Sequence, residues 1–178
     1  MVSPSIARAL GADVEVSTGD GDVELEALAG TVDVGTGDGD VTLRGGRGDI
    51  RLHTGDGSVT GRGLDGSVEV STGDGNVDIT GRFDGVTAST GDGELTANAA
   101  SGSRMLQPWH LESQDGSITL GVPRDLAAHI DASTGDGTVR SSIPLSRVES
   151  SRMVGDLNGG GPSILLRTGD GSIQLDQL

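Results

Sequence analysis

The chain has 178 residues with 32 glycines, one tryptophan, one phenylalanine, no tyrosine and no cysteine. A core with so few aromatic residues and so many glycines must be thin, which favours a repeated architecture over one compact globule. The net charge of −15 argues against binding to nucleic acid or to an anionic membrane surface, because both interactions depend on cationic side chains. The lack of cysteine excludes disulfides and thiolate metal sites.

Residues 1–12 allow two interpretations. Ser3 followed by Pro4 is typical of the start of a helix, which would cap one end of the molecule. In the second interpretation, which the sequence supports equally, the segment is the last part of an upstream repeat unit. No run approaches the ~18 apolar residues of a membrane span, so we expect no direct membrane insertion by this segment. Any export signal or membrane anchor is expected to lie outside this sequence.

From residue 18 onward, the tetrapeptide Thr-Gly-Asp-Gly recurs in register. Five copies follow one another with a constant period: Thr18–Gly21, Thr36–Gly39, Thr54–Gly57, Thr72–Gly75 and Thr90–Gly93. Two more copies lie at Thr134–Gly137 and Thr168–Gly171, and a degenerate copy, Ser-Gln-Asp-Gly, lies at 113–116. A fixed period of this length is the signature of a repeat architecture.

Between these tetrapeptides, apolar and polar residues alternate with period two, as expected for β-strands. Each 18-residue unit is predicted to hold two short strands, the constant Gly-Asp-Gly turn and a second, variable turn. Residues one period apart form aliphatic columns, such as Val14, Val32, Ile50, Val68 and Val86. These columns favour an all-β, parallel β-solenoid of about eight rungs, spanning residues 1–178 as one domain. An antiparallel meander or barrel is the alternative.

The repeat lengthens in the second half of the chain. The extra residues fall at 99–111, 121–130 and 141–163, each after the second strand of a unit. We therefore expect all three insertions to emerge at the variable-turn edge, opposite the Gly-Asp-Gly edge. The final segment, Ile173–Leu178, shows no evident cap, which hints at further chain, a partner or end-to-end self-association.

Irregular segments on a regular scaffold often carry function, and aromatic and arginine side chains are favoured at interfaces. The candidate interaction residues in the insertions are Arg104, Met105, Trp109, His110, Arg147 and Arg152. The competing interpretation is that Trp109, Met105 and Leu106 fold back to cover the side of the solenoid.

The aspartates of the constant turns would stack into a ladder, which suggests two roles. The structural role is turn formation, in which threonine and aspartate bond the turn backbone and the glycines supply positive φ. The alternative is divalent-cation binding, since carboxylates and turn carbonyls are hard oxygen ligands. The calcium-binding nonapeptide pattern fails, because Ile50 stands where the ligating aspartate belongs.

Enzyme motifs are absent from the sequence. The three histidines, at 53, 110 and 129, occupy dissimilar repeat positions and have no metal-ligand spacing. No nucleophile elbow, phosphate loop or zinc motif occurs. We therefore expect a non-catalytic protein with no catalytic residues, no cofactor and no bound metal.

The Thr-Gly-Asp-Gly-x-Val-x-Leu units, as in Thr36–Leu43, resemble the bacterial "putative adhesin" β-strand-repeat family, relatives of the toast-rack envelope domains. The closing Leu157–Pro162 segment before the last unit adds to the resemblance. It implies a right-handed solenoid in a cell-envelope or surface location, with no established catalytic residues. The expected function is a scaffold or adhesin-like interaction module, whose partner is an unknown protein or a second copy joined through the solenoid ends.

Overall fold

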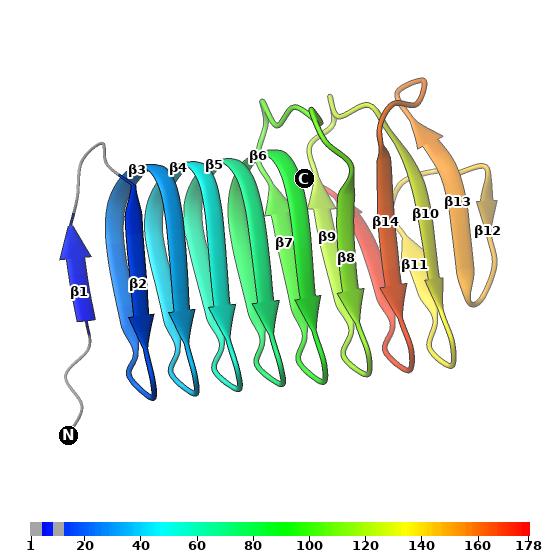
Figure 1. The fold of residues 1–178 in the computed structure, drawn as a ribbon. Helices are drawn as coiled ribbons and strands as arrows, with labels where there is room; N and C mark the ends of the chain where they lie inside the picture. The colour runs from blue at the N-terminus through cyan, green and yellow to red at the C-terminus, as the bar shows by residue number, and fades with distance from the viewer. Residues whose placement is uncertain (1–4, 9–12) are drawn as a thin grey trace.

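The computed structural model describes residues 5–8 and 13–178, which form an open column of β-coils (Figure 1). Its first half contains β1 (Ser5–Arg8), β2 (Val14–Thr18), β3 (Val23–Thr36), β4 (Val41–Thr54), β5 (Val59–Thr72), β6 (Val77–Thr90) and β7 (Leu95–Ala99). Its second half contains β8 (Trp109–Ser113), β9 (Ile118–Val122), β10 (Ala128–Thr134), β11 (Val139–Ser141), β12 (Arg147–Val148), β13 (Arg152–Leu157), β14 (Ser163–Thr168) and β15 (Ile173–Gln177). The described part of the chain includes no helix suited to crossing a bilayer.

The column has two faces. On the front face, β2, the second halves of β3 to β6, β8, β14 and β10 pair in parallel. On the back face, β1, the first halves of β3 to β6, β7, β9, β15 and β11 pair in the same way. Front strands run downward in Figure 1, back strands run upward, and β3 to β6 follow one another to the right, so the coil is right-handed. The solenoid prediction is confirmed.

The alternating pattern explains why the coils stack. Inward residues of successive coils pair directly, as in Val32 with Ile50 and Ile50 with Val68, and all three are buried. Their neighbours in sequence, such as Arg51, face solvent. One thin aliphatic core therefore runs the length of the column, and burial of these side chains supplies the main driving force for stacking.

The variable turn is a bend within one strand and not a break between two. Strands β3, β4 and β5 are each 14 residues long, and their pairing continues close to or through the bend. Gly45 and Gly63 begin the bend with φ of 73° and 67°, and Ala27 occupies the equivalent place with φ of 55°. This conformation favours glycine, so Ala27 is strained where its counterparts are not.

The constant turn is held by threonine and by close packing of glycine. Thr54 Oγ1 donates to Gly39 O of the preceding coil at 2.9 Å and accepts from Gly57 N of its own turn at 3.3 Å. The motif glycines do not have positive φ, contrary to the prediction. They are required because a Cβ on Gly55 would lie 2.5 Å from Gly37 O of the preceding coil.

The N-terminal segment resolves one of the two alternatives. Residues 5–8 form β1, which pairs in parallel with β3 as Ser5 with Val23 and Arg8 with Glu26. This is the back strand of an upstream coil, so the helical-cap interpretation is wrong for these residues. Ser3 and Pro4 lie outside the described residues.

The C-terminal coil departs from sequential stacking. On the front face β14 lies between β8 and β10, where Leu165 pairs with both His110 and Asp131. On the back face β15 lies between β9 and β11. The last coil of the sequence is therefore inserted between two earlier coils, and Ile173–Leu178 is not the end of the column.

The third insertion covers the far end of the front face. Strand β13 pairs antiparallel with β10, and β12 pairs antiparallel with β13 (Figure 1). On the remaining edge of β11, Val139 N donates a hydrogen bond to Ser150 O at 2.9 Å. The first two insertions emerge at the bend edge, as expected. The third differs from the expectation, because it forms a hairpin that covers the edge of β10, which would otherwise be exposed at the end of the column.

Candidate functional site

The first irregular segment, residues 100–108, joins β7 to β8 at the bend edge. Backbone hydrogen bonds fix it to the bend of β6: Arg104 N donates to Phe83 O at 3.0 Å, and Leu106 N donates to Asp84 O at 2.9 Å. We call residues 100–108 the bend loop. Because its backbone is anchored at several points, its side chains project from defined positions.

The apolar residues of the bend loop and β8 divide between core and surface. Trp109 is fully buried, and its ring meets that of Phe83 edge to face, with centroids 6.0 Å apart. Met105 packs against the same core. Leu106 remains 70% exposed. Trp109 therefore offers no surface to a partner, because it fills the inward column between Val86 and Ile164.

The four charged or titratable candidates all have a partner nearby. The pairs are Arg104 with Asp84 at 3.7 Å, His110 with Glu112 at 3.4 Å, Arg147 with Glu149 at 3.2 Å and Arg152 with Asp131 at 3.2 Å. The arginine and histidine side chains are 45–74% exposed. Apart from the Arg152–Asp131 pair, such surface pairs contribute little to stability and can be exchanged for contacts with a partner.

These candidates do not form one site. Arg104 and Met105 lie in the bend loop, and His110 follows on β8. Arg147 and Arg152 lie on the β12–β13 hairpin at the end of the column. On the front face, His110 is separated from Arg147 by β14, β10 and β13, so the two are roughly 19 Å apart at ordinary strand spacing.

A cluster of charges fixes the end hairpin to the column. The Asp131 carboxylate on β10 contacts Arg152 of β13 and Arg167 of β14, each at 3.2 Å. Partial burial pushes the pKa of Asp131 upward, but its hydrogen bonds and charge interactions with Arg167 and Arg152 outweigh burial and lower the pKa below its ordinary value. Arg152 therefore has a structural role in joining the hairpin to the coils.

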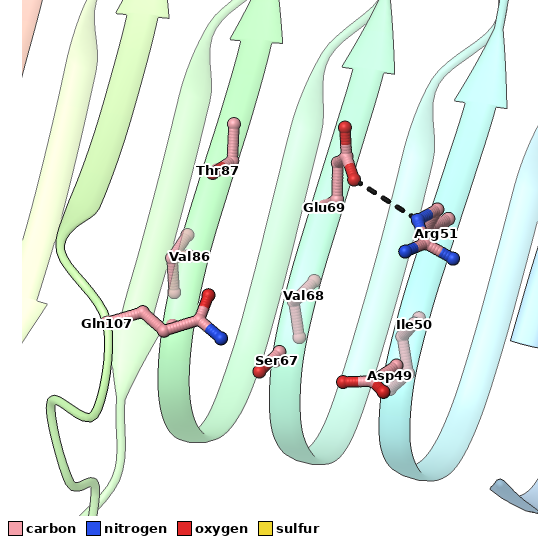
Figure 2. Close-up of a pocket in the computed structure, with 10 residues that line it drawn as sticks. Asp49, Ile50, Arg51, Ser67, Val68, Glu69, Val86, Thr87 and Gln107 are labelled. Carbon is pink, nitrogen blue, oxygen red and sulfur yellow. Dashed lines mark hydrogen bonds and ion pairs between the residues drawn. The ribbon is translucent and has the colours of Figure 1, made fainter. Parts of the chain in front are cut away.

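A polar hollow of about 300 Å³ opens on the front face beside the bend loop (Figure 2). Its lining includes Asp49 and Arg51 of β4, Ser67 and Glu69 of β5, Thr87 of β6 and Gln107 of the bend loop. Arg51 Nε contacts Glu69 Oε2 at 3.3 Å. The hollow exists because Gly85 has no side chain where it pairs with Ser67, and Gln107 forms the adjoining wall. We call this the front hollow.

A second depression of about 630 Å³ lies along the bends of β3 to β6. Its floor is mainly glycine and small apolar residues, because positions such as Gly45, Gly46 and Gly63 have no side chain. On its rim, Asp65 forms ion pairs with Arg47 and Arg82. This bend groove is thus an apolar strip bordered by charges that already neutralise one another.

The aspartates of the constant turns face solvent on the opposite edge. All eight are exposed: 20, 38, 56, 74, 92, 115, 136 and 170. Because the last coil is inserted, Asp170 follows Asp115 in the stack and precedes Asp136. No group of three His, Asp or Glu side chains in the described residues is arranged to hold a metal ion. Among the side chains of the repeated tetrapeptide, the threonine hydroxyl and not the aspartate carboxylate forms the bonds between coils.

Residues 10–176, nearly the whole chain, match the family described as Toastrack DUF4097. The chain belongs to this family. No curated protein and no solved structure matches it significantly. The family membership confirms the expected toast-rack relationship and agrees with the open parallel coil. The family match assigns this Toastrack domain no reaction, ligand or partner. The description of the family does not include the word adhesin, so that part of the expected resemblance is not confirmed.

Two surface features of this Toastrack domain were missed from the sequence. Leu106 and Val148 are exposed large apolar residues, at 70% and 50%. Both lie in insertions, where no repeat position assigned them an inward or outward direction. The front hollow was also missed, since it combines an absent side chain at Gly85 with Gln107 from a separate segment. The only sequence signal was a glycine at an outward strand position.

Proposed function

We propose that this Toastrack domain is a non-catalytic scaffold of the cell envelope or cell surface, and that it binds another protein through its insertions. The observation that carries the proposal is the exposure of Leu106 and Val148. Leu178 at the end of the chain is the third large apolar residue exposed among the described residues. Most other large apolar side chains of the described coils are buried in the core.

The surroundings of Leu106 suit a protein contact. Arg104 lies two residues away on the same anchored loop, and its side chain is 74% exposed. An apolar anchor beside an arginine is typical of interface centres. The loop is held by backbone bonds to β6, so little conformational freedom would be lost on binding. Burial of one leucine side chain is worth about 1.5–3 kcal/mol, or roughly 10- to 150-fold in affinity.

The envelope location and the adhesin-like role rest on the sequence resemblance. A net charge of −15 disfavours nucleic acid and anionic lipid as partners, which leaves a protein as the favoured class of partner. We use the word scaffold for a protein whose regular column holds its contact segments at fixed positions. Its coils set the spacing, and its insertions make the contacts.

Site-directed photocrosslinking in the cells that express this protein tests the proposal. A photoreactive residue replaces Leu106 in one variant, and Thr42, on the outward back face of β4, in the control variant. We expect a discrete adduct from position 106 and none of the same mass from position 42. Leu106→Ser should then weaken the affinity for the identified partner by at least about tenfold, with an unchanged melting temperature. Equal adducts from both positions, no adduct at 106, or an unchanged affinity would refute the proposal.

A further inference from the structure

The front hollow holds polar groups that the fold leaves without partners. Among the described residues, the side chains of Asp49, Ser67 and Gln107 form no hydrogen bond or ion pair with one another or with other side chains. Figure 2 shows Gln107 reaching from the bend loop toward Ser67, with Asp49 on the far side of the hollow. Three groups able to accept hydrogen bonds thus border one depression of about 300 Å³.

The charge of the hollow selects the sign of its ligand. Arg51 and Glu69 contact each other at 3.3 Å, so their charges largely cancel. The Asp49 carboxylate remains as the uncompensated charge of the lining. An anionic group would be repelled by Asp49, and a purely apolar group would leave these polar groups unsatisfied. A compact cation with several donors fits the lining.

We propose that the front hollow receives the ammonium group of a lysine side chain, supplied by the partner protein that contacts Leu106. This inference rests on the proposed function and deepens it, because it gives the partner's chemistry: a segment with a lysine close to an apolar residue. An ammonium has three donors, which match the Asp49 carboxylate, the Ser67 hydroxyl and the Gln107 amide oxygen. Gln107 and Leu106 are adjacent in the chain, so one short partner segment can reach both.

The overall charge of the protein favours the same partner. With a net charge of −15, the domain attracts basic segments over long distances and speeds their encounter. Leu106 provides the apolar contact that retains the segment after encounter. The front hollow then selects lysine over an uncharged side chain of similar length.

The test is a titration of the isotope-labelled full chain with short peptides, followed through backbone amide NMR signals. The probe is acetyl-Lys-Ala-Leu-amide, and its matched control is the same peptide with norleucine in place of lysine. We expect saturable shifts at Ser67, Gly85 and Gln107 with the lysine peptide only. Asp49→Asn should weaken binding about fivefold, as expected for one partly exposed charge contact, whereas Asp38→Asn should change it less than twofold. Asp38 is a matched control because it is an exposed aspartate on the opposite edge.

Three results would overturn the inference: equal binding of the norleucine peptide, equal weakening by Asp38→Asn and Asp49→Asn, or shifts distributed over the whole acidic surface. Cadaverine serves as a third probe, and tighter binding of this free diamine than of the peptide would also overturn a protein-docking role. Failure here is distinguishable from failure of the proposed function. If the partner crosslinked at Leu106 binds Asp49→Asn as tightly as wild type, the interaction surface stands and the lysine site falls.

Discussion

Substitution of the first glycine of a constant turn tests the close packing of the coils. In the turn that follows β4, Gly55 N donates to Gly37 O of the preceding coil at 2.6 Å. A Cβ added to Gly55 would lie 2.5 Å from that same oxygen, well inside the 3.0 Å limit that real Cβ atoms respect. Gly55→Ala therefore cannot keep both the side chain and the hydrogen bond.

The expected loss follows from these contacts. Separation of the two turns breaks the Gly55–Gly37 bond and weakens the second donation to Gly37 O, from Asp56 N at 3.3 Å. Each backbone bond contributes about 1 kcal/mol, and the strain of an overpacked contact adds about 1 kcal/mol or more. We expect Gly55→Ala to lower the free energy of unfolding by about 2–3 kcal/mol, a large part of the ~5–15 kcal/mol typical of a domain.

Urea denaturation followed by tryptophan fluorescence measures the effect. The chain has one tryptophan, and Trp109 is fully buried in the shared core, so its emission reports loss of packing. Gly35→Ala is the control, because a Cβ there has no neighbour within 4 Å and the backbone lies outside the left-handed region. That variant should be neutral or about 0.5–1 kcal/mol more stable. If the stabilities of Gly55→Ala and Gly35→Ala differ by no more than about 0.5 kcal/mol, the usual range for surface substitutions, the argument for close approach is wrong.

Three further predictions concern other parts of the column. Thr54→Val removes the hydroxyl that links two turns and should lower the free energy of unfolding by about 2–3 kcal/mol. Thr54→Ser keeps the hydroxyl and should lower it by about 1 kcal/mol. Equal losses for the two variants in urea denaturation would show that the hydroxyl is not needed. Ala27→Gly should raise stability by about 0.5–1 kcal/mol, because glycine adopts the left-handed conformation at position 27 without strain. Ala29→Gly, where the backbone is not left-handed, should lower stability. A higher melting temperature for Ala29→Gly than for Ala27→Gly would contradict the strain at Ala27. Because ion pairs lower the pKa of Asp131, its stabilising effect is fully present above the unfolded-state pKa of about 4 and is lost as pH falls further. The stability difference between wild type and Asp131→Asn should therefore shrink below about pH 4, and a difference that grows on acidification would refute the assignment.

The repeated part of the fold was predictable because one physical pattern occurs in every coil. The columns through Val32, Ile50 and Val68 are aliphatic, and the intervening residues are polar, so both the strand period and the parallel stacking follow from the sequence. The role of the turn glycines was not predictable. Positive φ and close approach to a neighbouring backbone both demand glycine, and only the stacked structure separates these two causes.

The order of the last coils was hidden for a related reason. The turns at 134–137 and 168–171 have the same sequence, so each fits against any other coil and the motif cannot specify its neighbour. The order of the coils instead depends on the hairpin of β12 and β13. Its strand β13 pairs antiparallel with one edge of β10, so only the other edge of β10 is free to pair with β14. The sequence also located the bend loop but assigned Leu106 to the core alternative, because apolar character alone does not give direction in an irregular segment.

Insertion of the C-terminal coil has a consequence for how the protein is made. The coils from β2 to β6 each pair with the coil that comes next in sequence, so they can stack as they leave the ribosome. Strands β8 and β10 cannot acquire their shared neighbour until β14, which follows the β12–β13 hairpin in sequence, has been synthesised. During that interval β8 and β10 both have a free edge and the same alternation of buried and outward residues, and they can pair with each other in a non-native stack. Opening that stack to admit β14 would be a slow, late step, so the N-terminal half should fold during translation and the C-terminal half only after β14 and β15 have been synthesised.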